Sequence, residues 1–242
     1  MLKIFNTVLA LLLVVSWQAV QAKTTYAEKL CQNPDYECLK IKRSVTWDKL
    51  FPDPTMRDLV KRINRVNIQP QRGMVIAIPK NLNHVQYMNF SPLPHNIGPQ
   101  PNKVIVVDLS QLAYGAYDQS GQLVQWGAVS GGQDYCSDIN SRCTTPIGTF
   151  NISHKKGGGC KSGKYPIEKP GAPMPYCMFF HNGFAIHGSY TVPGYHASHG
   201  CVRVTPEDAK WLNEEFIDLP GQGGTTVIIK PYSNATVADA SS

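Results

Sequence analysis

The amino-acid sequence predicts a mainly β fold: a sandwich or partly open barrel with one prominent helix, preceded by a small α/β unit. Three observations predict it. Short apolar runs alternate with glycine-rich turns from residue 103 onward, as strands of such folds do. A well-capped helical segment begins at Thr205, and a helix followed by a strand is indicated between residues 56 and 79. The 242 residues are enough for one sizeable core and a small appendage.

Residues 1–22 have the features of a secretory signal peptide. Lys3 supplies a short positive segment, residues 8–15 (VLALLLVV) supply an apolar one, and residues 20–22 (VQA) place small side chains before a cleavage site. The alternative is a transmembrane anchor, but the apolar run is shorter than the roughly 20 residues that span a bilayer. We therefore expect export to the periplasm or cell envelope, a mature chain starting near Lys23, and no stable membrane span.

The chain is modestly basic, with a formal net charge of +6. Nucleic acid is not expected as the partner of an exported protein. A mild positive excess suits an anionic polymer of the cell envelope, although it is equally an ordinary surface property.

Residues 23–82 are expected to form the small α/β unit. Leu59, Ile63 and Val66 recur at helical spacing, and residues 73–79 (GMVIAIP) predict a short strand closed by proline. This helix, the Asn after it and the Gly-led strand resemble a degenerate LysM-type glycan-binding module, which implies contact with glycan strands. The alternative is a helical cap that only packs on the main domain.

Residues 83–102 are expected to be a linker, because four prolines in this stretch exclude a central strand. The main domain then runs over residues 103–231, and a flexible tail is expected over residues 232–242. The strands that we expect in the main domain are 104–107, 113–117, 123–129, 146–152, 184–187 and 225–230.

The prominent helix is expected directly after residue 204. Thr205 suits the N-cap, Pro206 suits the first helical position, and Glu207 and Asp208 suit the positive end of the helix dipole. Thr205 and Asp208 approximate a capping box. Three apolar side chains are expected to face inward: Ala209, Leu212 and Phe216. Cys201 therefore lies on a rigid segment, between a strand end and a capped helix.

Cysteine usage singles out Cys201. Seven cysteines are present, and in an oxidising compartment disulfides form and persist. Six of them fall into neighbouring pairs, namely Cys31 with Cys38, Cys136 with Cys143, and Cys160 with Cys177. Six cysteines allow several connectivities, so this pairing is a hypothesis. The remaining cysteine, Cys201, is then a candidate reactive thiol.

The segment from Ser198 to Arg203 (SHGCVR) can carry nucleophilic catalysis. A thiol needs a base to become a thiolate, and His187, which ends an apolar strand, is the candidate base. His199 is expected to shape the pocket or to lie on the oxyanion side. Backbone N–H groups around His199, Gly200 and Cys201 can form an oxyanion hole, and Arg203 suits a substrate carboxylate.

Three other interpretations of this cluster stay open. Zinc ligands can come from His196, His199, Cys201 and His187, although this spacing is not a known ligand pattern. A redox site lacks the usual Cys-x-x-Cys, and the fourth interpretation is a purely structural cluster. Papain-like hydrolases place Cys before His, whereas His187 precedes Cys201 here.

The motif around Cys201 resembles the signature of the L,D-transpeptidase (YkuD) family of peptidoglycan enzymes. The segments that carry the resemblance are residues 187–189 (HGS), Gly194 and residues 198–204 (SHGCVRV), with residues 106–109, 129–132, 145–150 (TPIGTF), 173–176 and 178–180 upstream. It covers roughly residues 103–231 and implies a YkuD-type β-sandwich. The six other cysteines and the loop over residues 154–173 are not part of the family pattern.

The resemblance implies a role for each matched residue. Cys201 would be the nucleophile and His187 its base, oriented by a backbone carbonyl near Gly188. The site would be lined by Ser198, His199 and Gly200, with Arg203, Tyr176 and Ser189 binding substrate. No metal and no cofactor is implied.

The resemblance also implies a reaction. The family attacks the bond after the diamino acid of a tetrapeptide stem of peptidoglycan, releases D-Ala, and passes the acyl group to an amine of another stem or to a protein lysine. Carbapenems typically acylate its thiol. An L,D-carboxypeptidase that uses water at the same Cys–His site, and a non-catalytic envelope-binding protein, are the alternatives.

Overall fold

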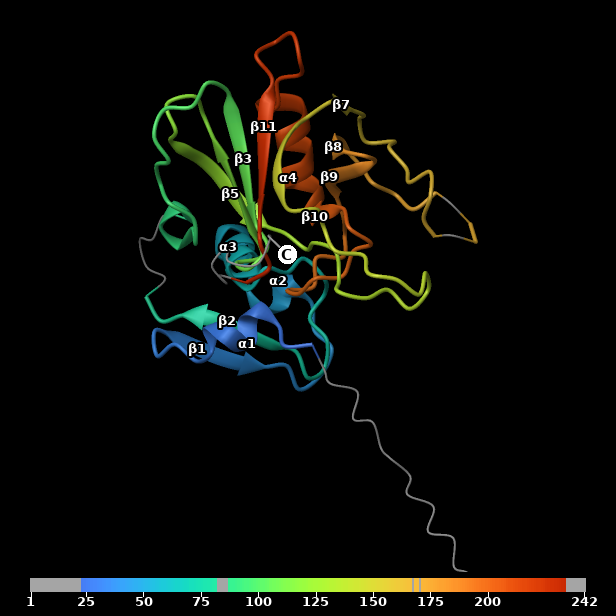
Figure 1. The fold of residues 1–242 in the computed structure, drawn as a ribbon. Helices are drawn as coiled ribbons and strands as arrows, with labels where there is room; N and C mark the ends of the chain where they lie inside the picture. The colour runs from blue at the N-terminus through green and yellow to red at the C-terminus, as the bar shows by residue number, and fades with distance from the viewer. Residues whose placement is uncertain (1–22, 82–86, 167, 170, 234–242) are drawn as a thin grey trace, which may run out of the picture.

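The computed structural model describes residues 23–81, 87–166, 168–169 and 171–233 (Figure 1). The predicted signal peptide lies outside the described residues, as does residue 234 onward of the predicted tail. In the part of the chain that is described, no helix combines the length and apolar character needed to cross a bilayer.

The N-terminal unit contains three helices and a sheet of two short strands. Its elements are α1 (Tyr26–Leu30), β1 (Tyr36–Lys40), α2 (Trp47–Leu50), α3 (Pro54–Asn64) and β2 (Val75–Pro79). Strands β1 and β2 are antiparallel, and a disulfide joins Cys31 to Cys38. The sequence identified α3 and β2, whose apolar residues are periodic. It missed α1 and α2, which are short, and β1, which is mostly exposed and has no alternating pattern.

This unit is fastened to the main domain by polar contacts. Arg62 on α3 donates to both carboxylate oxygens of Asp208, at 3.0 and 2.8 Å, and to the carbonyl of Trp126 at 2.8 Å. The side-chain amide of Asn67 donates to the carbonyl of Ser189 at 2.6 Å and accepts from the N–H of Val192 at 2.8 Å. The unit therefore fixes the 189–192 segment of the main domain.

From residue 87 onward, where it is described, the segment expected to be a linker packs along the main domain. It contains a short 3₁₀ helix, η1 (Tyr87–Phe90), and the Tyr87 ring stacks on Trp126. Leu93 is buried, and the carbonyls of Pro94 and His95 accept hydrogen bonds from Tyr117 and Leu123. Its apolar side chains make it part of the core despite its prolines.

Two open sheets form the main domain. The larger has the order β5-β4-β3-β11-β6, and the smaller has the order β10-β9-β8-β7. The strands of the larger sheet are β3 (Lys103–Asp108), β4 (Ala113–Tyr117), β5 (Leu123–Ala128), β6 (Gly148–Asn151) and β11 (Thr225–Lys230). Those of the smaller are β7 (His154–Lys155), β8 (Met178–His181), β9 (Phe184–Gly188) and β10 (Val202–Val204). The arrangement confirms the predicted mainly β sandwich.

One core joins both sheets to the predicted helix. Helix α4 (Pro206–Trp211) continues as one wide turn, η2 (Leu212–Phe216), and buries the three predicted side chains. The larger sheet contributes Ile105, Val107, Val227 and Ile229 to this core, and the smaller contributes Met178, Ile186, Val202 and Val204.

The helix start differs from the expected capping box in one respect. The Thr205 hydroxyl accepts from the N–H of Asp208 at 3.1 Å, as a cap does. The Asp208 carboxylate, however, is buried against Arg62 on α3. Asp208, predicted as part of the capping box, therefore ties the N-terminal unit to the helix.

Tyr232 contacts the main domain through its hydroxyl group. Tyr232, placed in the predicted tail, donates from its hydroxyl to the carbonyl of Gly132 at 2.9 Å and accepts from the N–H of Thr145 at 2.7 Å. It holds two segments that flank the candidate site.

Candidate active site

Strand pairing brings the predicted catalytic residues to one face of the smaller sheet. Strands β9 and β10 are parallel, with Arg203 opposite His187 and Val202 opposite Ile186. Side chains alternate between the faces of a strand, so Val202 and Ile186 enter the core. Cys201 and Arg203 consequently share the opposite face with His187.

A tight turn presents Cys201 to this face. The hydroxyl of the buried Ser198 accepts from the N–H of Gly200 at 3.0 Å and donates to the carbonyl of Cys201. Gly200 has a φ of +117°, and a Cβ on it would lie 2.3 Å from a ring carbon of Phe184. Only glycine fits both constraints, which explains the small residue before the cysteine.

His187 is buried, and one of its ring nitrogens is fixed by the backbone. Its Nδ1 lies 2.9 Å from the carbonyl oxygen of Gly188, which only accepts, so Nδ1 carries the proton. Burial lowers the pKa of His187 to about 4, against the raising effect of that carbonyl and with a further lowering by Arg203. The ring is therefore neutral near neutral pH, with Nε2 as its basic atom.

Cys201 is a free thiol, whereas the other six cysteines form disulfides in the pairing that the sequence favoured. Burial raises the pKa of the Cys201 thiol, while the backbone at Ala185 and the charge of Arg203 act to lower it. A thiol with a raised pKa and an imidazole with a lowered pKa, on the same face of the sheet, are both neutral in the resting site.

Arg203 is anchored at the edge of the same face. Its guanidinium donates to the carbonyl and hydroxyl of Thr191, at 3.3 and 3.2 Å. Burial lowers the pKa of Arg203, and the neighbouring Cys201 acts to raise it. Thr191 belongs to the segment held by Asn67, so the N-terminal unit indirectly steadies Arg203.

A hollow of about 610 Å³ opens over Cys201. Seven of the residues singled out from the sequence line it: His187, Gly188, Ser189, Ser198, His199, Cys201 and Arg203. Gly200 lies behind them, buried against Phe184. Tyr176 is not among the lining residues. Its ring packs beside Gly158 and the core, so its expected role in substrate binding has no geometric support.

One wall of this hollow comes from the 154–173 loop and the adjoining Met174, residues for which we predicted no role. Lys161, Lys164, Tyr165 and Met174 line the hollow, and all lie within the ring closed by the Cys160–Cys177 disulfide. Cys177 directly precedes β8, so this disulfide ties the wall to the sheet that carries His187.

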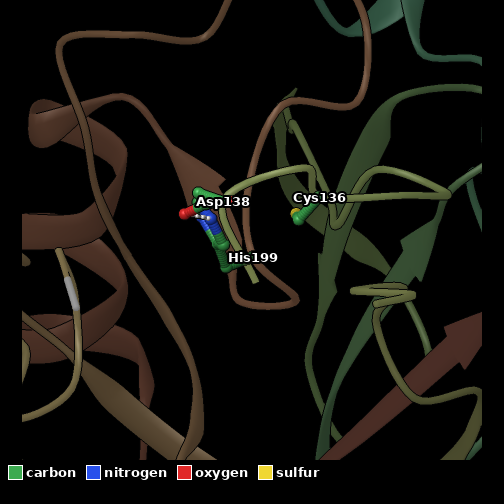
Figure 2. Close-up of side chains that lie close together, drawn as sticks. All are labelled: Cys136, Asp138 and His199. Atoms are coloured by element: carbon green, nitrogen blue, oxygen red, sulfur yellow. Dashed lines mark hydrogen bonds and ion pairs between the residues drawn. The ribbon is translucent and has the colours of Figure 1, made fainter. Parts of the chain in front are cut away.

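A second disulfide supports the turn before Cys201. Cys136 and Cys143 both pack on the carbonyl of Ser198, at 4.0 and 3.8 Å, and Gln133 donates its N–H to the same oxygen at 3.0 Å. The segment closed by this disulfide carries Asp138, whose carboxylate bonds Nε2 of His199 at 2.7 Å (Figure 2).

The zinc alternative is not supported by the positions of its ligands. Nδ1 of His196 accepts from the N–H of Gly131 at 3.2 Å, and burial lowers the pKa of this imidazole to about 4 while the backbone at Leu109 acts to raise it. Among the described residues, the one group with metal-ligand geometry is Cys136, Asp138 and His199 (Figure 2). Cys136 is disulfide-bonded and offers no thiolate, so this group is not a zinc site either.

The main domain is similar to known L,D-transpeptidases. The family model of the L,D-transpeptidase catalytic domain (YkuD) matches residues 102–229. An L,D-transpeptidase structure from Xylanimonas cellulosilytica is 24% identical with a TM-score of 0.52, over 71% of this chain and 77% of that one. One from Stackebrandtia nassauensis is 25% identical with a TM-score of 0.44, over 57% and 61% of the two chains. No curated protein matches the sequence.

Proposed function

The chain belongs to the L,D-transpeptidase catalytic-domain family, and from this premise we propose that Cys201 is its nucleophile and His187 its general base. At the level of the family, it is a peptidoglycan L,D-transpeptidase. The observation that carries the assignment of residues is the free thiol of Cys201 on the face that His187 shares, inside a hollow of about 610 Å³. The substrate class is the tetrapeptide stem of peptidoglycan.

Acylation starts from the neutral pair. As Sγ of Cys201 attacks the carbonyl carbon of the diamino acid, Nε2 of His187 takes the thiol proton. His187 then gives this proton to the nitrogen of the terminal D-Ala as the C–N bond breaks. A thioester on Cys201 remains, and His187 is neutral again.

The oxyanion that forms during this step needs donors near Cys201. The N–H of Gly200 is already bonded to the Ser198 hydroxyl, so it is not the donor. We assign the role to the N–H groups of His199 and Cys201. Arg203, anchored by Thr191 on the same face, supplies positive charge for a carboxylate of the stem.

Transfer completes the cycle when an amine attacks the thioester and Cys201 leaves as the thiol. Transfer to a neighbouring stem gives a cross-link between third-position residues, and transfer to a protein lysine gives an anchored protein. Export to the periplasm or cell envelope is part of the same proposal, since three disulfides suit an oxidising compartment. The N-terminal unit is proposed to contact glycan strands.

Incubation with a purified disaccharide-tetrapeptide, followed by mass analysis of the products, tests the function. We expect cross-linked dimers and free D-Ala from the wild type, and neither from Cys201→Ala. Tripeptide as the sole product would make the protein an L,D-carboxypeptidase. No product, together with no adduct from a carbapenem, would make it a non-catalytic envelope-binding protein.

A further inference from the structure

Three cationic side chains line the hollow over Cys201, and no carboxylate accompanies them. They are Lys161 and Lys164 from the 154–173 loop and Arg203 from β10. Among the residues that the structure describes, no Asp or Glu lines this hollow, and none lies within ion-pair distance of these three cations. The site therefore suits a ligand that carries more than one negative charge.

The wall that carries the two lysines is a built arm. Its two runs are hydrogen-bonded to each other, with the N–H of Ser162 donating to the carbonyl of Ala172 and the N–H of Met174 to the carbonyl of Cys160, each at 2.9 Å. The Cys160–Cys177 disulfide joins this arm to the start of β8. The lysines are thus mounted on a cross-linked segment, which limits the positions that their side chains can reach.

Aromatic contacts link Lys164 to the turn that presents Cys201. Its Nζ lies 5.3 Å from the centroid of the Tyr165 ring. The Tyr165 ring in turn packs on the ring of His199, with centroids 4.5 Å apart. Because His199 is two residues before Cys201, these contacts place a cation of the wall near the nucleophile's turn.

The donor stem carries several carboxylates. The terminal D-Ala has one, which leaves with it. On the acyl side of the scissile bond, a γ-linked glutamate before the diamino acid keeps its α-carboxylate, and a diaminopimelate in third position has a further one on its side chain. Arg203 pairs with one carboxylate, so the two lysines of the wall are free for another.

We propose that Lys161 and Lys164 bind a carboxylate on the acyl side of the donor stem, and that they thereby select stems in which this group is not amidated. This inference rests on the proposed acyl transfer and adds a specificity determinant that is specific to this chain's 154–173 loop. An ammonium group donates hydrogen bonds and carries charge, so it pairs well with a carboxylate. An amide is neutral and turns an NH₂ group toward one of the donors.

Three tetrapeptide stems test the proposal: one with both acyl-side carboxylates free, one amidated at the glutamate α-carboxyl, and one amidated at the side-chain carboxyl of diaminopimelate. The readout is kcat/KM for D-Ala release. The test variant is the double substitution Lys161→Met and Lys164→Met, which removes two charges and keeps long side chains. Lys161→Arg with Lys164→Arg retains the charges.

The matched control is Lys156→Met with Lys169→Met. Both of these lysines are exposed on the same loop, and neither lines the hollow, so the net charge changes equally without touching the site. Alkylation of Cys201 by iodoacetamide, a neutral reagent without a carboxylate, checks in every variant that the thiol and its surroundings are intact.

We expect the wild type to prefer the free stem over one of the two amidated stems by about 10-fold, and that stem identifies the carboxylate. The Met test variant should lose about 10-fold on the free stem, mainly through KM, with no further loss on that amidated stem. The Arg variant and the control should keep the preference, and the alkylation rate should change by less than about 2-fold.

Equal kcat/KM for the three stems in the wild type would overturn the proposal. So would a Met test variant that keeps the preference or loses the same factor on all three stems, or a control that loses the preference too. A wild type that releases D-Ala from none of the stems would instead overturn the proposed function itself.

Discussion

The imidazole of His187 donates from Nδ1 to the carbonyl oxygen of the next residue, Gly188, across 2.9 Å. A carbonyl orients the ring as a carboxylate would, but it brings no negative charge to stabilise an imidazolium. Burial therefore dominates, and the pKa of His187 falls to about 4. As the proposed base, His187 would therefore hold a proton only during bond formation.

Replacing His187 should affect acylation far more than replacing His199. His187→Gln removes the base that takes the thiol proton, and we expect acylation by a carbapenem to slow by about 10²–10⁴-fold. His199→Gln should slow the same step much less, because Nε2 of His199 bonds the Asp138 carboxylate and is not proposed to take the thiol proton. Stopped-flow loss of the carbapenem chromophore measures both. Equal effects would contradict the choice of His187 as base.

The pH dependence of acylation should follow the lowered pKa of His187. Below about pH 4 the ring is protonated and cannot accept the thiol proton, so the rate should fall with a midpoint near 4 rather than near the ordinary histidine value. Initial rates of carbapenem acylation between pH 3.5 and 8 give the midpoint. A midpoint near 6.5 would mean that the ring is not desolvated as described.

The lowered pKa of His187 also makes the stability of the fold depend on pH. The pH profile of acylation therefore needs a control for unfolding. The folded pKa of His187 lies below the unfolded one, so between about pH 6.5 and 4 the unfolded chain binds the extra proton. The free energy of unfolding therefore falls as the pH falls through this range. Near-ultraviolet circular dichroism at each pH separates loss of the base from loss of the fold.

Gly200→Ala should damage the turn before Cys201. Its φ of +117° disfavours any Cβ, and the new carbon would meet Phe184 at 2.3 Å. We expect a loss of about 1–3 kcal/mol in the free energy of unfolding, with slower acylation because the turn shifts. Urea unfolding measures the first and the carbapenem rate the second. Gly221→Ala is the control, since its Cβ would meet no atom within 4 Å although its φ is also positive.

The contact between Arg62 and Asp208 should fasten the N-terminal unit. Asp208 is 1% exposed and Arg62 is 14% exposed, so Arg62→Met leaves a buried carboxylate without its charge partner. We expect a loss of about 3–5 kcal/mol in the free energy of unfolding. Asp58 pairs with the same arginine at an exposed position, and Asp58→Asn should cost less than about 1 kcal/mol. Equal urea midpoints for the two variants would contradict this account.

The parts that could be predicted from the sequence are those encoded locally. The strands at 113–117 and 225–230 have apolar patterns, and the helix start at Thr205 has its cap and proline in place. Cys201 was identified because it is the cysteine left over after three neighbouring pairs, and because of the motif around it. His187 was identified because it ends an apolar strand. The strand, cap and motif signals each span fewer than about ten residues. The odd number of cysteines is instead a count over the whole sequence.

The parts that could not be predicted depend on pairings between distant segments. Asp138 and Tyr165 lie in loops without periodicity, and they reach His199 through the tertiary fold and two disulfide-closed loops. Tyr232 looked like the start of a tail because its hydroxyl partners are about 100 residues away in sequence. Tyr176 was chosen by its motif position; it is not among the residues that line the hollow, and its ring packs against the core.

The central claim is that Cys201 carries the acyl group, and intact-protein mass analysis after exposure to a carbapenem tests it most directly. We expect one adduct on the wild type, mapped by peptide analysis to Cys201, and none on Cys201→Ala under the same conditions. An adduct that persists on Cys201→Ala, or that maps to another residue, would contradict the account.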